Sequence, residues 1–301
     1  MKLNSKNYYS QKANLEYFSV SQFKAFKRCE AAAMAEIGDE YTPPYSRALL
    51  LGAFVDEMLT GTPASQMKFI AQNYSEIFQK SSKLLLVLDK LGNARERRDF
   101  LEGYENIFHP SNKPYADILQ ALETVARVRS QPLMMKYLGG GHQRIMTGEI
   151  AGCPVKGKFD SYKPGEFIAD LKYLKDFRSP NMFENAISFY GYDMQLAVYR
   201  ELVRQNTGEE LPCFLVIATK QEPADLAVVE VSSFDLDRAL DAFKNQLPHF
   251  RAVKSGAIPA ERCESHDCPY CRGTKVLTEP IDAALLGMSR KHREAMSGNI
   301  I

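Results

Sequence analysis

Residues 213–220, CFLVIATK, form an unbroken apolar run of the length of one β-strand. Strands with one face in water alternate apolar and polar residues, whereas a continuous run is typical of a strand buried on both faces. Helical patterns lie on either side of it, at 181–205 and 234–250, and a further strand is expected at 227–231. This combination predicts an α/β core.

The chain before this strand changes from helical to strand-rich patterns. Helices are expected to begin near Ser19 and to cover 46–59. The region 64–137 is expected to be mostly helical, with a charged, turn-like interruption at 92–99. No glycine-rich dinucleotide or Walker motif is present, which argues against a doubly wound nucleotide-binding fold. Alternating patterns with an intervening turn predict three further strands: 142–149, 155–162 and 167–173.

The charge balance excludes a protein that coats nucleic acid by net charge alone. The chain has 38 lysine and arginine residues against 37 aspartate and glutamate residues, a formal charge of +1. Contacts with nucleic acid must therefore come from local basic patches or from metal ions held by carboxylates. The sequence has no apolar run of membrane-spanning length, and its N-terminus lacks the apolar core of a signal peptide. We therefore expect a cytoplasmic protein with no membrane partner.

A carboxylate and an amine share one face of a predicted strand. Residues two apart in a strand project to the same side, so Asp170 and Lys172 point together. Their neighbours Ile168 and Ala169 are apolar, which places both charged groups beside a buried sheet. Burial of such groups is unfavourable unless they are paired or bind a metal. For these two residues alone, an ordinary ion pair is the simplest interpretation.

Asp160 lies on the preceding strand, and the length of the turn decides which face it occupies. A connection of three or five residues around Pro164-Gly165 places Asp160 and Asp170 on one face, whereas two or four residues do not. We predict the first register. The two aspartates could then hold a hard divalent cation, Mg²⁺ or Mn²⁺, with Lys172 orienting a water or stabilising the transition state. Glu149, one strand earlier, favours this interpretation over an Asp160 that only caps the hairpin.

Three of the six cysteines form a late cluster, Cys263, Cys268 and Cys271. In a cytoplasmic chain this spacing favours thiolate ligands for a metal over disulfides. Three thiolates need a fourth ligand, and His266 would complete a zinc site whereas Cys29 would complete an all-cysteine site. Cys29 could equally be a buried thiol in a helix.

Five motifs in order along the chain resemble those of the PD-(D/E)xK nuclease superfamily, in particular its RecB/RecE-like exonucleases. The motifs are a serine-initiated helix that ends in a cysteine (19–29), Gly52-Ala-Phe-Val-Asp56, Gly157-Lys-Phe-Asp160, Asp170-Leu-Lys172 and Gln195-Leu-Ala-Val-Tyr199. Two positions depart from the family pattern. Asp56 stands where the first motif usually has a histidine, and Glu30 follows the cysteine where a proline is common.

The resemblance implies a restriction-endonuclease-like fold, with a mixed central sheet flanked by helices. It implies one nuclease domain over 1–301, with a helical insertion at about 62–138 and a cysteine-cluster segment at 261–275. Glu149 or Asp56 would complete the coordination shell of the metal ion. The implied metal ligands are Asp56, Asp160, Asp170 and the Leu171 carbonyl, and the implied catalytic or DNA-holding residues are Lys172, Glu149, Gln195 and Tyr199.

The resemblance also bears on the cysteines and the substrate. In AddB-type nucleases one N-terminal and three C-terminal cysteines hold a [4Fe–4S] cluster, which implies such a cluster here, with structural zinc as the alternative. Its ligands would be Cys29, Cys263, Cys268 and Cys271.

The implied function is a Mg²⁺-dependent exonuclease that degrades linear double-stranded DNA from its ends in phage or bacterial recombination. A single-strand annealing recombinase would be its partner, and the ring-forming relatives make a homo-oligomer conceivable. Two alternatives stay open at this point. One is a non-catalytic, zinc-stabilised DNA-binding or assembly module, and the other is a structure-specific endonuclease or RNA-processing enzyme.

Overall fold

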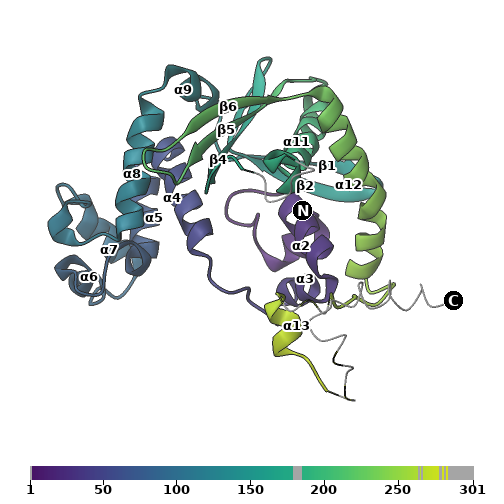
Figure 1. Ribbon diagram of the computed structural model, residues 1–301, viewed down its shortest axis with the longest axis horizontal. Helices are drawn as coiled ribbons and strands as arrows, with labels where there is room; N and C mark the ends of the chain where they lie inside the picture. The colour runs from purple at the N-terminus through teal and green to yellow at the C-terminus, as the bar shows by residue number, and fades with distance from the viewer. Residues whose placement is uncertain are drawn as a thin grey trace.

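The computed structural model describes residues 2–178, 185–263, 265, 267–277, 280 and 283. Four strands form a central sheet in the order β3-β4-β5-β6, and two form a separate antiparallel hairpin (Figure 1). The strands are β1 (Arg144–Ile150), β2 (Cys153–Phe159), β3 (Ser161–Lys163), β4 (Phe167–Leu174), β5 (Cys213–Thr219) and β6 (Leu226–Val231). The α-helices are α1 (Gln11–Glu16), α2 (Val20–Arg28), α3 (Glu30–Ile37), α4 (Arg47–Thr60), α5 (Pro63–Ile77), α6 (Lys83–Leu88), α7 (Ala94–Glu102), α8 (Ala116–Arg129), α9 (Pro132–Leu138), α10 (Ala186–Phe189), α11 (Tyr192–Thr207), α12 (Ser233–Lys254) and α13 (Pro269–Gly273), with one 3₁₀ turn at Pro110–Asn112.

Strand β5 lies inside the sheet and confirms the prediction made from its apolar sequence. It pairs in parallel with β4 and antiparallel with β6. Helices α8 and α9 contact it from one side and α11 from the other. Both faces of the strand are therefore shielded from water, as its continuous apolar run requires. The fold is of the mixed α/β class that the sequence predicts.

The sheet separates two hydrophobic cores. Ala169 and Leu171 of β4 face a core shared with α4, α8 and α9. Ile168, on the opposite face, belongs to a core formed with α2, α11, α12 and the hairpin. Figure 1 shows α8 and α4 on one side of the sheet and α11 and α12 toward the other. The alternation of strand residues places Asp170 and Lys172 on the side of α2 and α11.

The single strand expected over 155–162 is two strands in different sheets. β2 ends at Phe159 within the hairpin, and β3 begins at Ser161 within the central sheet. Asp160 is the one residue between them. The sequence over 155–162 does not mark the position at which the chain passes from one sheet to the other, so this break could not be predicted.

The expected interruption at 92–99 is mostly helix. Helix α7 begins at Ala94, and the side chain of Asn93 caps it by accepting hydrogen bonds from two backbone N–H groups of the first turn. The charged residues that suggested a turn form a solvated helix face, because arginine and glutamate are favourable helix residues.

The long helix expected over 181–205 is divided into α10 and α11. Gly191 lies between them with a φ of 63°, a left-handed conformation that glycine adopts without steric cost. Residues 181–184 lie outside the described part of the chain. None of the described helices is long and apolar enough to cross a membrane.

The hairpin approaches α11 closely at Gly157. A Cβ at this position would lie 2.9 Å from a methyl carbon of Leu202 and 3.1 Å from two ring carbons of Tyr199. Tyr199 is held in place, because its hydroxyl donates a hydrogen bond to the carbonyl of Lys158 at 2.7 Å. The absence of a side chain at Gly157 therefore sets the distance between β2 and α11.

Replacement of Gly157 by alanine should lower the free energy of unfolding by about 1–3 kcal/mol, because overpacking forces neighbours out of their preferred positions. Denaturant unfolding followed by circular dichroism measures the change. Gly52→Ala is the control, since a Cβ at Gly52 in α4 meets no atom within 4 Å. That variant should be as stable as the wild type or more so. Equal stability of Gly157→Ala and the wild type would contradict the packing argument.

Candidate functional site

The turn between β3 and β4 has the length that brings the two aspartates together. Lys163 pairs with Phe167, so three residues connect the strands, and Ser161 pairs with Ala169. Continuing this register by one residue puts Asp160 opposite Asp170. The Oδ2 atom of Asp160 accepts a hydrogen bond from the backbone N–H of Leu171 at 3.1 Å. The predicted register is therefore confirmed.

Asp170 is fully buried at the centre of this group. Its Oδ1 atom accepts a hydrogen bond from the side-chain amide of Gln195 at 2.8 Å. Its Oδ2 atom contacts the ammonium group of Lys172 in an ion pair, and among the described residues it has no other polar partner. Asp170 and Lys172 thus share one face of β4, as expected. A buried carboxylate oxygen with an unused lone pair is a suitable ligand for a cation.

Helix α11 supplies two of the expected residues, Gln195 and Tyr199. The amide of Gln195 lies 3.0 Å from the hydroxyl oxygen of Tyr199, and that hydroxyl donates to the carbonyl of Lys158. The ring of Tyr199 stacks on Phe159 with 4.3 Å between centroids. A chain of hydrogen bonds therefore runs from β2 through α11 to the Asp170 carboxylate, which explains why a glutamine lies on an otherwise apolar helix face.

A third aspartate, Asp56, approaches from α4. Desolvation raises the pKa of Asp56, and the charge of Asp170 raises it further. The pKa of Asp160 lies well above its ordinary value, first because of desolvation and then because of the charges of Asp170 and Asp56. A hard divalent cation bound through oxygen ligands would relieve the repulsion between these carboxylates. Among the described residues, however, their oxygen atoms are less closely gathered than the sulfur atoms of the four clustered cysteines.

The pKa of Lys172 is also raised, which for an amine favours the charged form. Desolvation alone would lower the pKa of its amine, but the carboxylates of Asp170 and Asp160 outweigh it and raise the pKa. Lys172 is therefore an ammonium ion at neutral pH. It also lies 5.1 Å from the ring centroid of Tyr192, which contributes a cation–π contact.

Glu149 does not reach this site, contrary to the expectation that it could complete the metal's shell. It is exposed near the turn of the hairpin, where it pairs with Pro154, whereas Arg144 at the other end of β1 pairs with Phe159 next to Asp160. Five residues of strand correspond to roughly 17 Å. The backbone N–H of Glu149 instead donates to Gln205 of α11 at 2.9 Å.

The side chain of Leu171 faces the core on the far side of the sheet from Asp170. Only its carbonyl could serve the metal, and that role stays a prediction. His142, which the sequence leaves without a role, lies beside the site: its Nδ1 atom is 2.8 Å from the carbonyl oxygen of Asp160.

A pocket of about 290 Å³ opens beside the carboxylates. Asp160, Lys172, Gln195 and Tyr199 form its floor, and three further lysines reach it from α2 and β2. Lys24 was not expected at the site from the sequence. The one feature of the sequence that could have indicated Lys24 is its place two residues before the buried Phe26, on the opposite face of an amphipathic helix. The three lysines are Lys24, Lys156 and Lys158.

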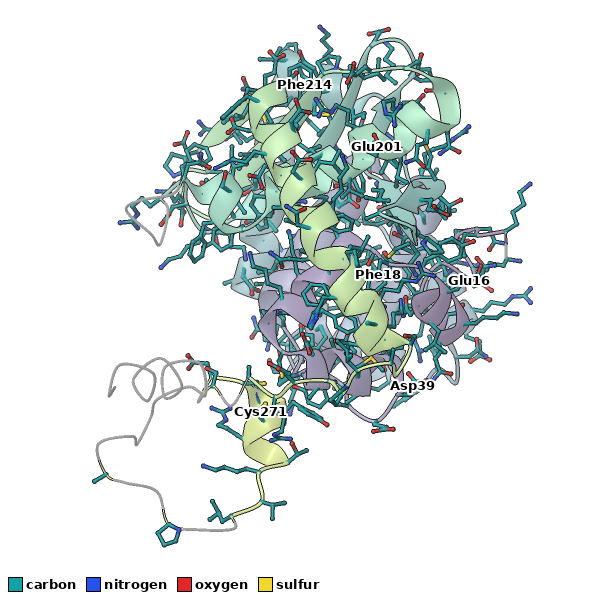
Figure 2. The ribbon with its side chains drawn as sticks, turned by 90° about the vertical axis from the view of Figure 1, so that its right-hand side faces the viewer. Glu16, Phe18, Asp39, Glu201, Phe214 and Cys271 are labelled. Carbon is teal, nitrogen blue, oxygen red and sulfur yellow. The ribbon has the colours of Figure 1, made fainter. Side chains whose placement is uncertain are left out.

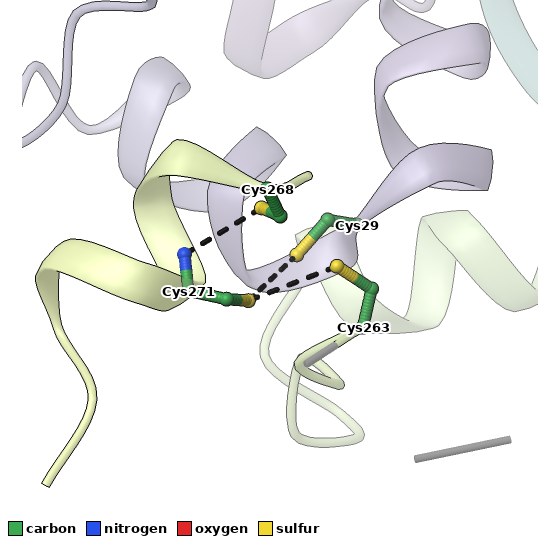
Figure 3. Close-up of side chains that lie close together, drawn as sticks. All are labelled: Cys29, Cys263, Cys268 and Cys271. Carbon is green, nitrogen blue, oxygen red and sulfur yellow. Dashed lines mark hydrogen bonds between the residues drawn. The ribbon is translucent and has the colours of Figure 1, made fainter. Parts of the chain in front are cut away.

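The four cysteines named from the sequence lie close together at the C-terminal end of α2, where Cys29 follows the last helical residue. Their sulfur atoms lie within 4.8 Å of one another, and within the described residues no other group of three or more cysteine, histidine or acidic ligands is as compact. Figure 2 shows Cys271 on the yellow helix α13, close to the purple N-terminal helices, and Figure 3 shows all four thiols pointing toward one another. The Sγ atom of Cys271 lies 3.6 Å from that of Cys29 and 3.8 Å from that of Cys263.

This geometry favours Cys29 as the fourth ligand over a structure in which it is an isolated buried thiol. His266, the alternative fourth ligand, lies outside the described residues. Burial would raise the pKa of Cys268, but the backbone N–H of Cys271 and the neighbouring thiols donate to its sulfur and lower it. Four convergent thiols fit either a zinc ion or an iron–sulfur cluster.

Glu30, which departs from the family pattern, fastens the cysteine segment to α3. Its carboxylate accepts a hydrogen bond from the backbone N–H of Glu261 at 2.9 Å and lies 2.7 Å from the ring nitrogen of His249. The N–H of Ala31 donates to the carbonyl of Glu261 at 3.0 Å. These contacts hold the chain just before Cys263 against the helix that follows Cys29.

The sequence matches a protein family, and the fold matches a solved structure. Residues 19–274 match a family described as a PDDEXK-like domain of unknown function, DUF3799. The chain belongs to this family. A crystal structure from Eubacterium rectale, described as a "putative exonuclease", superposes on this PDDEXK-like domain with a TM-score of 0.79. The two are 35% identical, and the match covers 94% of this chain and 97% of that one. No curated protein matches the chain.

The PDDEXK-like assignment confirms the superfamily resemblance of the sequence. The matched region includes every acidic residue of the site, from Asp56 to Asp170, and all four clustered cysteines. The first residues of the chain, including the aromatic pair Tyr8 and Tyr9, precede it.

Replacement of Asp160 by asparagine should stabilise the cation-free protein at neutral pH. Because its pKa is raised in the folded state, ionisation of Asp160 disfavours folding as the pH rises above the ordinary range for a carboxyl group. Asparagine removes the charge, and its side-chain oxygen can still accept from Leu171. Thermal melts in EDTA should show a higher Tm for Asp160→Asn at pH 7, and the difference should vanish at acid pH.

The matched control is Asp241→Asn, since Asp241 on α12 is exposed and its nearest cation, Lys244, is 3.6 Å away. This variant should change stability by no more than about 0.5 kcal/mol. A lower Tm for Asp160→Asn than for the wild type at pH 7 would show that the Asp160 charge is compensated within the protein.

Proposed function

We propose that the protein is a metal-dependent deoxyribonuclease that hydrolyses phosphodiester bonds at the ends of linear double-stranded DNA. The observation that carries this proposal is the pairing of Asp160 with Asp170 across β3 and β4, with Lys172 in contact with Asp170. The family match and the description of the Eubacterium rectale protein as a "putative exonuclease" support the same reaction class.

Asp56, Asp160, Asp170 and the carbonyl of Leu171 would hold the cation. Bound Mg²⁺ or Mn²⁺ would lower the pKa of a water and neutralise charge on the phosphate. The protein itself keeps the carboxylates in place: Leu171 donates to Asp160, and Gln195 donates to Asp170. Through Tyr199, the same helix fixes Asp170 relative to the hairpin.

Lys172 supplies the positive charge for the reaction. Its ammonium group is held by Asp170 and faces the pocket, so it can donate to a water or to an oxygen of the scissile phosphate as negative charge develops there. Its raised pKa keeps it protonated. A donor already in position needs little reorganisation during the reaction, which is the main advantage of such a site.

The pocket lysines favour a polyanionic substrate. Lys24 and Lys158 form no ion pair with any acidic residue in the described part of the chain, so both can bind phosphates. Burial, and then the neighbouring charge of Lys172, lower the pKa of Lys24 to about 8, so a bound phosphate would favour its charged form. We extend the proposal to a RecB/RecE-like role in recombination, in which the remaining strand passes to a single-strand annealing protein. Assembly of several copies around DNA belongs to the same proposal.

The first test is digestion of linear and circular double-stranded DNA with Mg²⁺. Wild type should degrade the linear form, and Lys172→Ala should be slower by about 10²- to 10³-fold, as for the loss of one transition-state donor. Lys163→Ala is the matched control, because Lys163 is exposed and forms an ion pair with Glu166 in the turn. It should retain wild-type activity.

The outcomes separate the alternatives. Cleavage of the circular form at a similar rate would replace the exonuclease by an endonuclease. An inactive wild type that is folded, with its cysteine site filled, would overturn the nuclease proposal and leave a DNA-binding or assembly module.

For the four cysteines we propose a [4Fe–4S] cluster, with zinc as the alternative. The support is the convergence of four thiols from the two ends of the domain. This arrangement resembles that of AddB-type nucleases, although the spacing of four residues between Cys263 and Cys268 departs from theirs. The proposed role is structural: the cluster would join the segment 261–275 to the junction of α2 and α3 within a single nuclease domain.

Replacement of Cys29 by alanine should release the metal and lower the Tm, because a site of three thiolates binds far more weakly than one of four. Iron, sulfide and zinc analysis of protein purified without oxygen gives the metal content, and calorimetry gives the Tm. Cys153→Ala is the control for metal content, since Cys153 lies in β2 and does not belong to the group of clustered cysteines. Equal metal content in Cys29→Ala and wild type would exclude Cys29 as a ligand.

A further inference from the structure

Two adjacent tyrosines near the N-terminus line the pocket beside the carboxylates, and the nuclease chemistry proposed above gives them no role. Tyr8 is buried, with 6% of its surface exposed, whereas Tyr9 is 68% exposed. The two rings meet edge to face, 4.9 Å apart and at 83°. A large aromatic ring that is held on one edge by a buried neighbour and left open to solvent at the mouth of a pocket is suited to contact a ligand.

The segment that carries the tyrosines is fixed to the nuclease core. The N–H of Phe18 donates to the carbonyl of Pro154, and the N–H of Lys156 donates to the carbonyl of Phe18, so the segment pairs with the edge of β2. The buried ammonium group of Lys156 donates to the backbone carbonyl of Tyr8 and to the side chain of Asn14. Lys156 therefore holds the N-terminal segment in place against β2.

Two other lysines keep their charges directed at the pocket. The ammonium group of Lys158 lies 4.9 Å from the ring centroid of Tyr9. Lys24 reaches the pocket from α2 and donates to the carbonyl of Tyr190 at 2.8 Å. No described acidic residue forms an ion pair with either. The pocket therefore combines two available cations with an exposed aromatic ring, and its floor contains Asp160 and Lys172.

This combination is suited to a nucleotide whose base is free to stack. Cations bind the phosphates of the backbone, and an aromatic ring stacks on a base of any sequence. A base within a duplex has both faces covered by its neighbours, so only a terminal or unpaired base can stack on a side chain. The pocket, at about 290 Å³, is small for a ligand site and fits one nucleotide rather than a length of duplex.

We propose that Tyr9 is a stacking platform for an unpaired terminal base of DNA, and that Lys158 and Lys24 bind the adjoining phosphates next to the carboxylates. This inference rests on the proposed nuclease function and adds how the enzyme holds a strand end. Tyr9 and Lys158 are positioning residues: they fix the strand so that a phosphodiester lies at Asp160 and Asp170. The residue that supplies the platform precedes the family match, which begins at Ser19.

The test is a fluorescence titration with a single-stranded oligonucleotide that carries 2-aminopurine as its terminal base. Ca²⁺ replaces Mg²⁺ in the binding experiment, and electrophoresis of the probe confirms that it stays intact. Stacking on Tyr9 should quench the fluorescence of the wild-type complex. Tyr9→Ala should remove the quenching and raise the Kd about tenfold, within the range for loss of one stacked base, whereas Tyr9→Phe should resemble the wild type.

Two further variants sharpen the test. Tyr45→Ala removes another exposed tyrosine, which lines neither described pocket, and should leave binding unchanged. Lys158→Gln should reduce the slope of log Kd against log salt by about 0.7, the value for one phosphate contact with a single strand. In digestion assays with Mg²⁺, Tyr9→Ala should raise KM about tenfold and change kcat by less than twofold.

The results distinguish this proposal from the nuclease proposal. Wild-type quenching and KM in Tyr9→Ala, with an active wild type, would overturn the stacking platform and leave the nuclease intact. A wild type that neither binds the oligonucleotide nor cleaves DNA would overturn both. Loss of kcat with unchanged KM in Tyr9→Ala would also overturn the platform, since it would place Tyr9 in the chemistry instead of in substrate binding.

Discussion

The arrangement of the site depends on one buried carboxylate, that of Asp170. A fully buried negative charge requires partners, and each of its neighbours comes from a different element: Lys172 from β4, Gln195 from α11 and, across the turn, Asp160. The need to satisfy this group thus determines how α11 is set against the sheet. Because Tyr199 extends the same network to the hairpin, the position of β2 also follows from it. The buried charge of Asp170 is unfavourable without a cation, and the same charge positions Lys172 and Gln195 around it.

The break between the two sheets explains why Asp160 can serve the site at all. Within a continuous strand its carboxylate would be confined to one face of one sheet. As the residue that leaves the hairpin and enters the central sheet, it lies opposite Asp170 and accepts from Leu171 across the strand pair. The hairpin also carries Lys156 and Lys158 from the neighbouring positions of β2 to the pocket. One irregular residue therefore joins the acidic and the basic halves of the site.

The sequence was sufficient for those features that depend on local periodicity. The continuous run of β5 indicated a strand covered on both sides. The sequence around Pro164-Gly165 allowed two registers for Asp160 and Asp170, and the one we predicted is the one observed. Features that depend on packing between distant elements were not accessible in this way. Nothing in the spacing of Glu149 shows that it lies at the far end of its hairpin, and the pocket position of Tyr9 follows only from the contacts of its segment with β2. Cys29 could be preferred to His266 as the fourth ligand only through a family resemblance, since more than 200 residues separate it from Cys263.

Helix α2 connects the cysteine cluster to the pocket. Ser19 caps its first turn, Lys24 reaches the pocket from its middle, and Cys29 follows its last residue. Lys24 and Cys29 are five residues apart, about 7.5 Å along a helix axis. The helix is held sideways by Phe23, whose ring lies 4.5 Å from that of Phe243 in α12. Such packing restrains rotation of the helix, and a ligated thiolate at Cys29 would restrain its end. A metal bound at the cysteines, as proposed above, would therefore help to fix the position of Lys24 without taking part in the proposed chemistry.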